Sequence, residues 1–270
     1  NIFCCRSCGH IQTHDVIDRN ILFGSNYSYK PSYSKKLYEH FKDYANKLSE
    51  FINKSERYEE LVIDIGSNDG LFLSCIRSSL GFNVLGIEPA KGPRTFAIEN
   101  GIETLGEFFS YDFAQRLKVN PSIGNKTIKM ITANNVFAHC NNLNDFVKGV
   151  SLLLNDGSYF CFEISYLIDI IEKSLIGVFF HEHLSHHSLL PLIPFLKGYK
   201  IHLEEVFPVD QQGGSLVCIA KKQTYLKSRP KYGENLSSLI TKEKDLNINS
   251  VQAGELLTKA LLKSQNKVAH

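Results

Sequence analysis

The chain has 270 residues, of which 43% are hydrophobic and 21% charged, and its formal net charge is +2 at pH 7. This is the composition of a folded globular protein, and the near-neutral charge gives no reason to expect a nucleic-acid or membrane partner. We find no signal-peptide pattern at the start and no apolar run of the about 18 residues that a membrane span needs. The length suits one large domain with appendages or two domains.

The cysteines favour a reducing compartment. The chain has seven of them, an odd number, and Cys75, Cys140, Cys161 and Cys218 lie in apolar segments that suit small reduced core residues. We therefore expect a cytoplasmic protein. The chain begins with Asn1 rather than Met and ends in what resembles the approach to another strand, so we expect truncation at both ends.

A CxxC motif formed by Cys5 and Cys8 lies close to the start of the chain. Two such thiolates followed by Gly9 resemble half of a zinc knuckle, but a structural zinc needs four ligands. Two free thiols are an equally good interpretation. A redox-active pair is less favoured, because no strand–helix–strand context surrounds the motif.

A loop and a long helix are expected next. Gly, Ser, Asn and Pro residues predict a loop over 21–32, although this segment contains Tyr27 and Tyr29. Ser34 suits the N-cap of a helix over 35–52, in which apolar residues recur at helical spacing. Because such a stripe normally packs against other elements, we expect this helix to cover the core of the domain that follows.

The segment 61–70 predicts a buried strand followed by a tight turn. Residues 61–65 are apolar and mostly β-branched apart from Asp64, which predicts a buried strand of a parallel sheet, and an apolar run from residue 71 suits a helix. The tight turn between them consists of Gly66, Ser67, Asn68, Asp69 and Gly70. In an open α/β sheet, such a turn presents backbone N–H groups to a ligand. A strand–turn–helix without a ligand is the alternative.

An acidic residue after the next strand refines this prediction. The predicted strand 83–87 is followed by Glu88, a position that suits bidentate hydrogen bonds to a ribose diol. The turn lacks the G-x-G-x-x-G pattern of a dinucleotide-binding site. It therefore fits S-adenosylmethionine (SAM), which has no pyrophosphate, better than NAD.

The remaining segments alternate between strands and helices, which predicts an α/β domain. We expect strands at 102–105, 128–133 and 158–164, helices at 143–154 and 189–196, a closing antiparallel pair at 199–209 and 215–221, and a last helix at 251–263. Asn134 and Asn135 follow a strand and so lie at the ligand edge of the sheet. Phe108 is placed to flank an adenine, although core packing explains it equally well.

Four of the ten histidines lie between residues 181 and 187, the densest titratable cluster in the chain. His181 and His183 alternate, as zinc ligands on a strand do, but the H-E-x-x-H spacing and an evident third ligand are missing. A pair of core or surface histidines is the simplest alternative. Imidazole has a pKa of about 6.5, so the cluster can also supply a general base near neutral pH without a metal.

Five motifs, in one order, resemble the sugar C-methyltransferase family. They are D-I-G-S-N-D-G (64–70), G-I-E-P-A (86–90), A-N-N-V-F-A-H (133–139), H-E-H (181–183) and G-G-S-L (213–216). The resemblance covers nearly the whole chain and implies a class I SAM-dependent methyltransferase fold, an α/β Rossmann-like domain with a seven-stranded, mostly parallel sheet and an antiparallel closing strand. It also implies methylation of a ring carbon α to the ketone of a nucleotide-linked keto-deoxysugar, with dTDP as the expected nucleotide.

The resemblance also implies a domain organisation. Residues 1–33 would hold a partial zinc-binding segment and an active-site loop, 34–56 a covering helix, 57–224 the methyltransferase domain, and 225–270 a linker and the start of a C-terminal domain. A second CxxC would lie before Asn1, so the zinc site would be incomplete. The expected partner is the nucleotide-linked sugar, and we expect a monomer or weak oligomer.

Site residues follow from the same resemblance. His183 would be the general base, supported by His181, Glu182 and His139, while Tyr27 and Tyr29 would lie over the substrate unless they are surface tyrosines on a linker. The implied metal ligands are Cys5 and Cys8. The residues expected to bind the cofactor are Asp64, Gly66, Ser67, Asn68, Asp69, Gly70, Glu88, Pro89, Phe108, Asn134 and Asn135.

The chain departs from the family pattern at several positions. Phe180 stands where Tyr usually precedes H-E-H, which removes a hydroxyl from the predicted site. His186 and His187 stand at aromatic positions, Val217 replaces an Arg, and Asp64 replaces the commoner Glu. The competing functions are a non-catalytic SAM-binding module and an NAD-dependent nucleotide-sugar enzyme, the latter disfavoured by the absent G-x-G-x-x-G.

Overall fold

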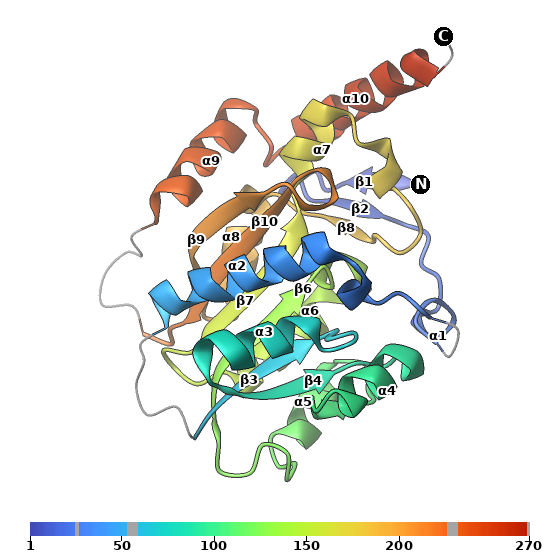
Figure 1. Cartoon of the computed structure of the whole chain (residues 1–270). Helices are drawn as coiled ribbons and strands as arrows, with labels where there is room; N and C mark the ends of the chain where they lie inside the picture. The colour runs from blue at the N-terminus through green and yellow to red at the C-terminus, as the bar shows by residue number, and fades with distance from the viewer. Residues whose placement is uncertain (25–26, 53–58, 226–231, 269–270) are drawn as a thin grey trace. The chain divides into compact units, whose positions relative to one another are not determined.

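The computed structural model describes residues 1–24, 27–52, 59–225 and 232–268 (Figure 1). Residues 226–231 of the segment expected to begin with a linker, and Ser25 and Asn26 of the tyrosine loop, lie outside the described residues. The chain separates into two compact units. Unit 1 consists of Asn1–Ile17, Asn135–Leu143 and Phe162–His270, and unit 2 consists of Asp18–Asn134 and Asn144–Cys161.

The strands form a seven-stranded sheet with the order β5-β4-β3-β6-β7-β10-β9. In unit 2, β3 (Glu60–Ile65) pairs in parallel with both β4 (Asn83–Ile87) and β6 (Thr127–Asn134), and β4 pairs in parallel with β5 (Thr104–Leu105). In unit 1, β9 (Ile201–Val209) and β10 (Ser215–Lys222) are antiparallel. Strand β7 (Tyr159–Ser165) is divided between the units. This order, with its antiparallel closing pair, confirms the predicted class I fold.

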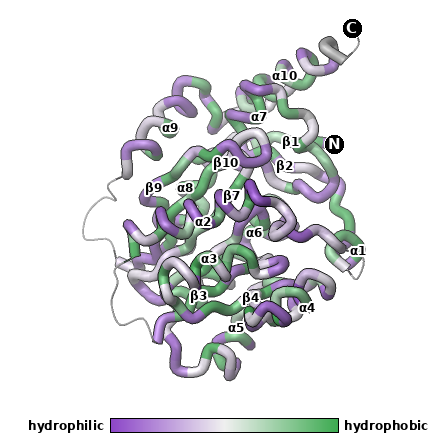
Figure 2. The backbone as a smooth tube through the Cα atoms, viewed as in Figure 1, coloured by the Kyte–Doolittle hydropathy of each residue, from purple (hydrophilic) through white to green (hydrophobic). Residues whose placement is uncertain are grey.

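Unit 2 is built around β3, whose residues are almost all buried and which carries the apolar colour in Figure 2. Helix α2 (Lys35–Phe51) begins as predicted, with the Ser34 hydroxyl accepting a hydrogen bond from the backbone N–H of Leu37. Helix α2 packs on α3 (Leu71–Leu80), where the ring centroids of Tyr44 and Phe72 lie 4.9 Å apart. The apolar stripe of α2 therefore serves packing, as its spacing indicates.

The other helices of unit 2 follow the alternating pattern. They are α1 (Arg19–Leu22), η1 (Pro31–Tyr33), α4 (Lys91–Glu99), α5 (Tyr111–Leu117) and α6 (Leu143–Leu153), whose first residue belongs to unit 1. Strand β5 is shorter than the predicted 102–105, because the backbone N–H of Ile102 bonds to the carbonyl of Ala97 and so closes the end of α4.

Unit 1 contains a second, three-stranded sheet that the sequence did not predict. Strands β1 (Ile2–Cys4) and β2 (Ile11–Thr13) form an antiparallel hairpin, and β2 pairs with β8 (Ser185–His186). The helices of this unit are η3 (Phe137–His139), α7 (Leu167–Lys173), η4 (Ile176–Val178), α8 (Leu189–Gly198), η5 (Gln211–Gly213), α9 (Glu234–Asp245) and α10 (Gln252–Val268). None of the described helices is long and apolar enough to cross a membrane.

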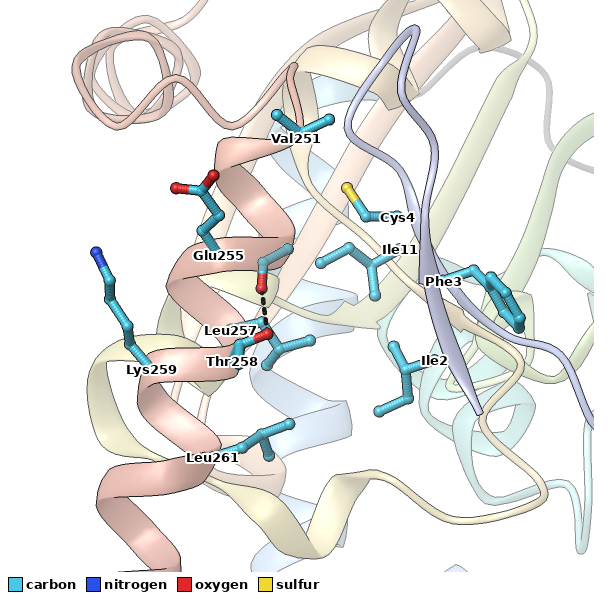
Figure 3. Close-up of a pocket in the computed structure, with 11 residues that line it drawn as sticks. Ile2, Phe3, Cys4, Ile11, Val251, Glu255, Leu257, Thr258, Lys259 and Leu261 are labelled. Carbon is cyan, nitrogen blue, oxygen red and sulfur yellow. Dashed lines mark hydrogen bonds between the residues drawn. The ribbon is translucent and has the colours of Figure 1, made fainter.

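A groove with a volume of about 560 Å³ lies between β1 and α10 in unit 1 (Figure 3). Apolar side chains, among them Ile2, Ile11, Leu257 and Leu261, line it. Within the described part of the chain, no residue predicted to bind a cofactor, metal or substrate lines this groove. The groove is therefore distinct from the predicted site residues.

Candidate functional site

The predicted cofactor turn follows β3 directly, and its backbone has the left-handed conformations that its residues allow. The φ angles of Gly66, Asn68 and Gly70 are 69°, 49° and 78°. The N–H groups of Gly66 and Ser67 both donate to the carbonyl of Ile87, at 2.8 and 3.2 Å. These bonds fasten the turn to the end of β4, and the positive φ at Gly70 explains why this position favours glycine.

Glu88, at the end of β4, joins the turn through a buried carboxylate that is 5% exposed. Its Oε2 accepts the backbone N–H of Asn68 at 2.9 Å, and its Oε1 accepts that of Ala90 at 2.8 Å. Burial raises the pKa of Glu88, and the two N–H groups oppose that rise. A carboxylate oxygen can accept more than one hydrogen bond, so both oxygens of Glu88 can still accept hydrogen bonds from a ribose diol.

Several buried polar atoms near the turn have no hydrogen-bond partner in the part of the chain that the structure describes. They are Oγ of Ser67, Oδ1 of Asn68, and both Oδ1 and Nδ2 of Asn134, all in unit 2. Leaving such a group unsatisfied costs about 1–3 kcal/mol, so each one calls for an explanation. A ligand with hydroxyl, amino and carboxylate groups would satisfy them, and these residues therefore fit SAM.

Asp64 lies at the end of β3 and is 3% exposed. Its Oδ1 accepts a hydrogen bond from the hydroxyl of Thr132, on β6, at 2.6 Å. Burial raises the pKa of Asp64 to about 7, Thr132 opposes this shift, and the charge of Glu88 adds to it. The structure thus shows Asp64 joining two strands beneath the turn, and its predicted contact with the cofactor stays a prediction.

Asp69 connects the cofactor turn with the tyrosine loop. Its Oδ2 accepts the backbone N–H of Ser32 at 2.9 Å, and its Oδ1 accepts that of Leu71 at 3.3 Å. Burial raises the pKa of the Tyr29 phenol, and the negative charge of Asp69 adds to the rise, so this phenol lies near the carboxylate. The structure therefore brings Tyr29 and the turn together within unit 2.

Two other predicted cofactor residues of unit 2 have cationic neighbours. The guanidinium of Arg19 lies 4.5 Å from the ring centroid of Phe108. Nη1 of Arg94 donates to the carbonyl of Pro89 at 3.0 Å. Phe108 therefore has a cation–π partner, and its predicted position beside an adenine stays a prediction.

The other predicted asparagine, Asn135, belongs to unit 1. It has a φ of 55°, and its backbone N–H donates to the carbonyl of Glu163, at 3.0 Å. Its Nδ2 lies 3.5 Å from Oε1 of the same glutamate, which is fully buried. The buried Glu163 is a further acidic group at the end of β7 in this unit.

His183, the predicted base, is held through both its backbone and its ring. Its N–H donates to the carbonyl of Phe180 at 3.0 Å, and its carbonyl accepts the hydroxyl of Thr13 at 2.9 Å. Its Nδ1 lies 2.9 Å from the carbonyl oxygen of Val178. A carbonyl can only accept, so Nδ1 carries the proton, and Nε2 of the neutral ring keeps its lone pair. In this tautomer, Nε2 can accept a proton as a general base.

His139 and Phe180 pack on the ring of His183, with centroid separations of 4.9 and 4.2 Å. Burial lowers the pKa of His183. Burial, together with the neighbouring His183, lowers the pKa of His139 to about 4. Both rings are therefore neutral at pH 7. The structure brings together His183 and His139, which the resemblance implies to be the base and a supporting residue.

His181 and Glu182 lie in a turn, which corrects one sequence interpretation. One interpretation of the sequence made His181 and His183 alternating zinc ligands on a strand. The strand β8 contains only Ser185–His186, so neither histidine lies in it. The hydrogen bond from the N–H of His183 to the carbonyl of Phe180 bends the chain here, so the two histidines do not alternate on a strand.

His186 and His187 stand where the family has aromatic residues, and in this chain they pack as rings. The ring of His187 is stacked on Phe137, with centroids 4.9 Å and planes 5° apart, and the ring of His186 lies 4.3 Å from that of Phe179. Burial lowers the pKa of His186 to about 3 and that of His187 well below its usual value. These neutral imidazoles therefore fill aromatic positions in the core of unit 1.

Cys5 and Cys8 lie in the turn of the N-terminal hairpin. The N–H of Gly9 donates to the carbonyl of Cys5, and the N–H of Cys5 donates to that of His10, at 2.9 and 2.8 Å. Among the described residues, no group of three or more His, Cys, Asp and Glu side chains is arranged to hold a metal. Two thiols do not complete a four-ligand zinc site, so the residues present do not fit a structural zinc.

Comparison with known proteins identifies the family of the chain. The family model described as a methyltransferase domain matches residues 34–196. The chain belongs to this methyltransferase domain family. The C-methyltransferase NovU from Streptomyces niveus is 27% identical to it over 220 residues, which are 82% of this chain and 50% of that protein. The methyltransferase chain described here therefore spans about half the length of the curated relative that it matches.

Solved structures share the fold of this methyltransferase domain. An S-adenosylmethionine-dependent methyltransferase from Clostridium acetobutylicum matches with a TM-score of 0.51 at 13% identity, covering 69% of this chain and 92% of that one. The magnesium protoporphyrin IX methyltransferase from Synechocystis PCC 6803, with bound SAH, matches with a TM-score of 0.52 at 10% identity, covering 76% and 92%. At these identities the similarity shows the fold alone.

Within each unit, sequence reasoning missed several residues that hold the candidate groups in place. Thr132 binds Asp64, Ser32 binds Asp69, Val178 fixes the tautomer of His183, and Thr13 binds its carbonyl. Ser32 and Val178 act through backbone groups, which every residue type has. Sequence alone gives no signal for them.

Proposed function

We propose that this chain is the SAM-dependent methyltransferase domain of a C-methyltransferase that acts on a carbon α to a ketone. Membership of the methyltransferase domain family supports the transfer of a methyl group. The 27% identity to a protein named a C-methyltransferase supports carbon as the acceptor. The observation that carries the proposal is the hydrogen bond from Nδ1 of His183 to the carbonyl of Val178, which leaves Nε2 of the neutral ring unprotonated.

Methylation of carbon needs a carbanion or enolate, and therefore a base. A proton on a carbon α to a ketone is acidic enough for a positioned base to remove. Nε2 of His183 would take this proton, while Nδ1–H keeps its bond to the carbonyl of Val178 and stabilises the imidazolium that forms. SAM, when bound, supplies the electrophilic methyl group.

The residues around the turn would bind the cofactor in unit 2. Glu88 would accept hydrogen bonds from the ribose hydroxyls, and the unpaired polar atoms of Ser67, Asn68 and Asn134 would find partners on the bound molecule. We propose a nucleotide-linked keto-deoxysugar as the substrate, on the strength of the five-motif resemblance. Tyr27 and Tyr29 would contact this sugar, with His139, His181 and Glu182 in supporting roles beside His183.

A mass-spectrometric screen tests the function. The full chain is incubated with SAM and a panel of nucleotide-linked keto-deoxysugars, and NMR locates the added methyl group. We expect one added methyl on the carbon next to the ketone. A methyl group on oxygen or nitrogen would contradict C-methylation. Calorimetry with S-adenosylhomocysteine and NADH separates the remaining cases: binding of the former without any methylation indicates a SAM-binding module, and binding of NADH alone indicates a nicotinamide enzyme.

A further inference from the structure

We propose that Thr13, the last residue of β2 in the N-terminal hairpin, is a positioning residue for His183. The inference rests on the proposed function, in which His183 is the base. Strand β2 pairs with β8, with Ile11 opposite His186 and Gln12 opposite Ser185. Thr13 follows these paired residues in β2 and is hydrogen-bonded to His183 itself.

Thr13 binds two consecutive residues of the histidine segment. Its backbone N–H donates to the carbonyl of Leu184, and its hydroxyl donates to the carbonyl of His183, both at 2.9 Å. A hydroxyl has a single proton, which the His183 carbonyl takes. Nε2 of His186, 3.5 Å from the same oxygen, can therefore only donate to it. One side chain thus links two histidines of the cluster.

The peptide group between His183 and Leu184 is held at both ends. Its carbonyl accepts the Thr13 hydroxyl, and its N–H, on Leu184, donates to the carbonyl of Ala138 at 2.8 Å. Ala138 immediately precedes His139, whose ring packs on that of His183. Because this peptide sets the direction of the His183 side chain, the Thr13 hydroxyl helps to fix the imidazole relative to both His139 and the carbonyl of Val178.

The loss of this one hydroxyl should therefore affect chemistry more than folding. Proton abstraction depends steeply on geometry, and a displacement of about 1 Å can cost about 10²-fold in rate. The hairpin keeps its backbone ladder to β8 without the hydroxyl. A purely structural role for Thr13 would lower stability and leave the chemistry of the folded protein unchanged.

Three variants of the full chain separate these roles. Thr13→Val keeps the β-branched shape that suits a strand and removes the hydroxyl, whereas Thr13→Ser keeps the hydroxyl. Gln12→Val is the matched control, because Gln12 is the exposed neighbour in β2 that faces Ser185 in the ladder. The measurements are kcat and KM with a keto-sugar substrate, solvent-deuterium exchange at the carbon α to the ketone, and the melting temperature.

We expect Thr13→Val to lower kcat and the exchange rate by about 10–100-fold, with the KM for SAM and the melting temperature close to those of the parent. Thr13→Ser should recover most of both rates, and Gln12→Val should behave as the parent does. The inference is wrong if Thr13→Val exchanges the proton as fast as the parent. It is also wrong if Thr13→Ser is as slow as Thr13→Val, or if Gln12→Val is equally slow.

A second readout does not depend on the substrate. NMR of the imidazole nitrogens, with the His183 signals assigned through His183→Asn, reports the tautomer. The parent should show His183 protonated at Nδ1, and Thr13→Val should show a mixture of both tautomers. An unchanged tautomer in Thr13→Val would overturn the inference. If the parent neither methylates nor exchanges any keto-sugar, the proposed function fails, and the tautomer measurement still decides the role of Thr13.

Discussion

At the scale of single residues, the histidine cluster shows which contacts a sequence can predict. The resemblance placed His139 and His183 in one pocket, and their rings do pack together at 4.9 Å. The tautomer of His183 was not predictable, because its partner is the backbone carbonyl of Val178. The resemblance assigned Asp64 to the cofactor, and the structure adds a hydrogen bond to Asp64 from Thr132, a residue that no sequence motif singled out.

Replacement of the base is the first prediction. His183→Asn should lower kcat by about 10²–10⁴-fold, the usual contribution of a positioned base. Its affinity for S-adenosylhomocysteine should stay close to that of the parent, because the polar groups of Glu88, Ser67, Asn68 and Asn134 that are proposed to bind the cofactor are unchanged. Steady-state kinetics and calorimetry check this. His14→Asn, at an exposed histidine of the same unit, is the control, and equal rates in the two variants would exclude His183 as the base.

Removal of the buried acid at the cofactor turn is the second prediction. Glu88→Ala takes away the proposed ribose acceptor and leaves the N–H groups of Asn68 and Ala90 without their partner. We expect S-adenosylhomocysteine binding to weaken by about 1.5–3 kcal/mol, the range for hydrogen bonds to a charged group. Calorimetry measures the loss. An affinity equal to that of the parent would remove Glu88 from the cofactor site.

At the scale of elements, the strands and helices with strong patterns were predicted well. Strand β4 (Asn83–Ile87) has the predicted bounds, and α2 begins at the predicted cap. The hairpin β1–β2 was missed because each strand has three residues, too few for a periodic pattern. Helix α9 was missed because the segment reads as polar, with only Leu236, Ile240 and Glu243 buried.

The link between the tyrosine loop and the cofactor turn gives the third prediction. Asp69→Ala removes the acceptor of the Ser32 N–H. We expect faster amide exchange at Ser32 and a higher KM for the sugar, because the loop loses its bond to the turn. Hydrogen exchange followed by mass spectrometry measures the first effect. Asp112→Ala, which changes an acid on α5 in the same unit, serves as the control, and unchanged exchange at Ser32 in Asp69→Ala would contradict the prediction.

At the scale of the whole molecule, the lowered pKa values of two histidines predict how the free energy of unfolding depends on pH. Burial lowers the pKa of His139 to about 4 and of His186 to about 3, against about 6.5 in an unfolded chain. Below pH 6.5 the unfolded chain binds protons that the folded protein excludes, so the free energy of unfolding decreases as the pH falls. By the time the folded pKa is reached, the loss should be on the order of 3 kcal/mol for His139 and about 4 kcal/mol for His186.

The buried carboxyl of Asp64 has the opposite effect on the pH dependence of stability, so a variant that lacks it tests the prediction. Its folded pKa of about 7 lies above the unfolded value of 3.8, so the folded protein binds its proton first, and stability rises as the pH falls between these values. We expect urea unfolding to give a lower free energy at pH 5 than at pH 7, and a larger decrease in Asp64→Asn, where this compensation is absent. Equal free energies at the two pH values in both proteins would contradict the prediction.

The pairing of β2 with β8 has a consequence for the order in which the protein matures during synthesis. Thr13 and His183 are 170 positions apart in the chain. At a translation rate of about 5–20 residues per second, the hairpin leaves the ribosome roughly 10–30 s before its partner strand exists. During that interval Ile11, which is fully buried in the folded protein, lacks the strand that it pairs with. The geometry of the proposed base is therefore completed only after the chain has been made as far as β8.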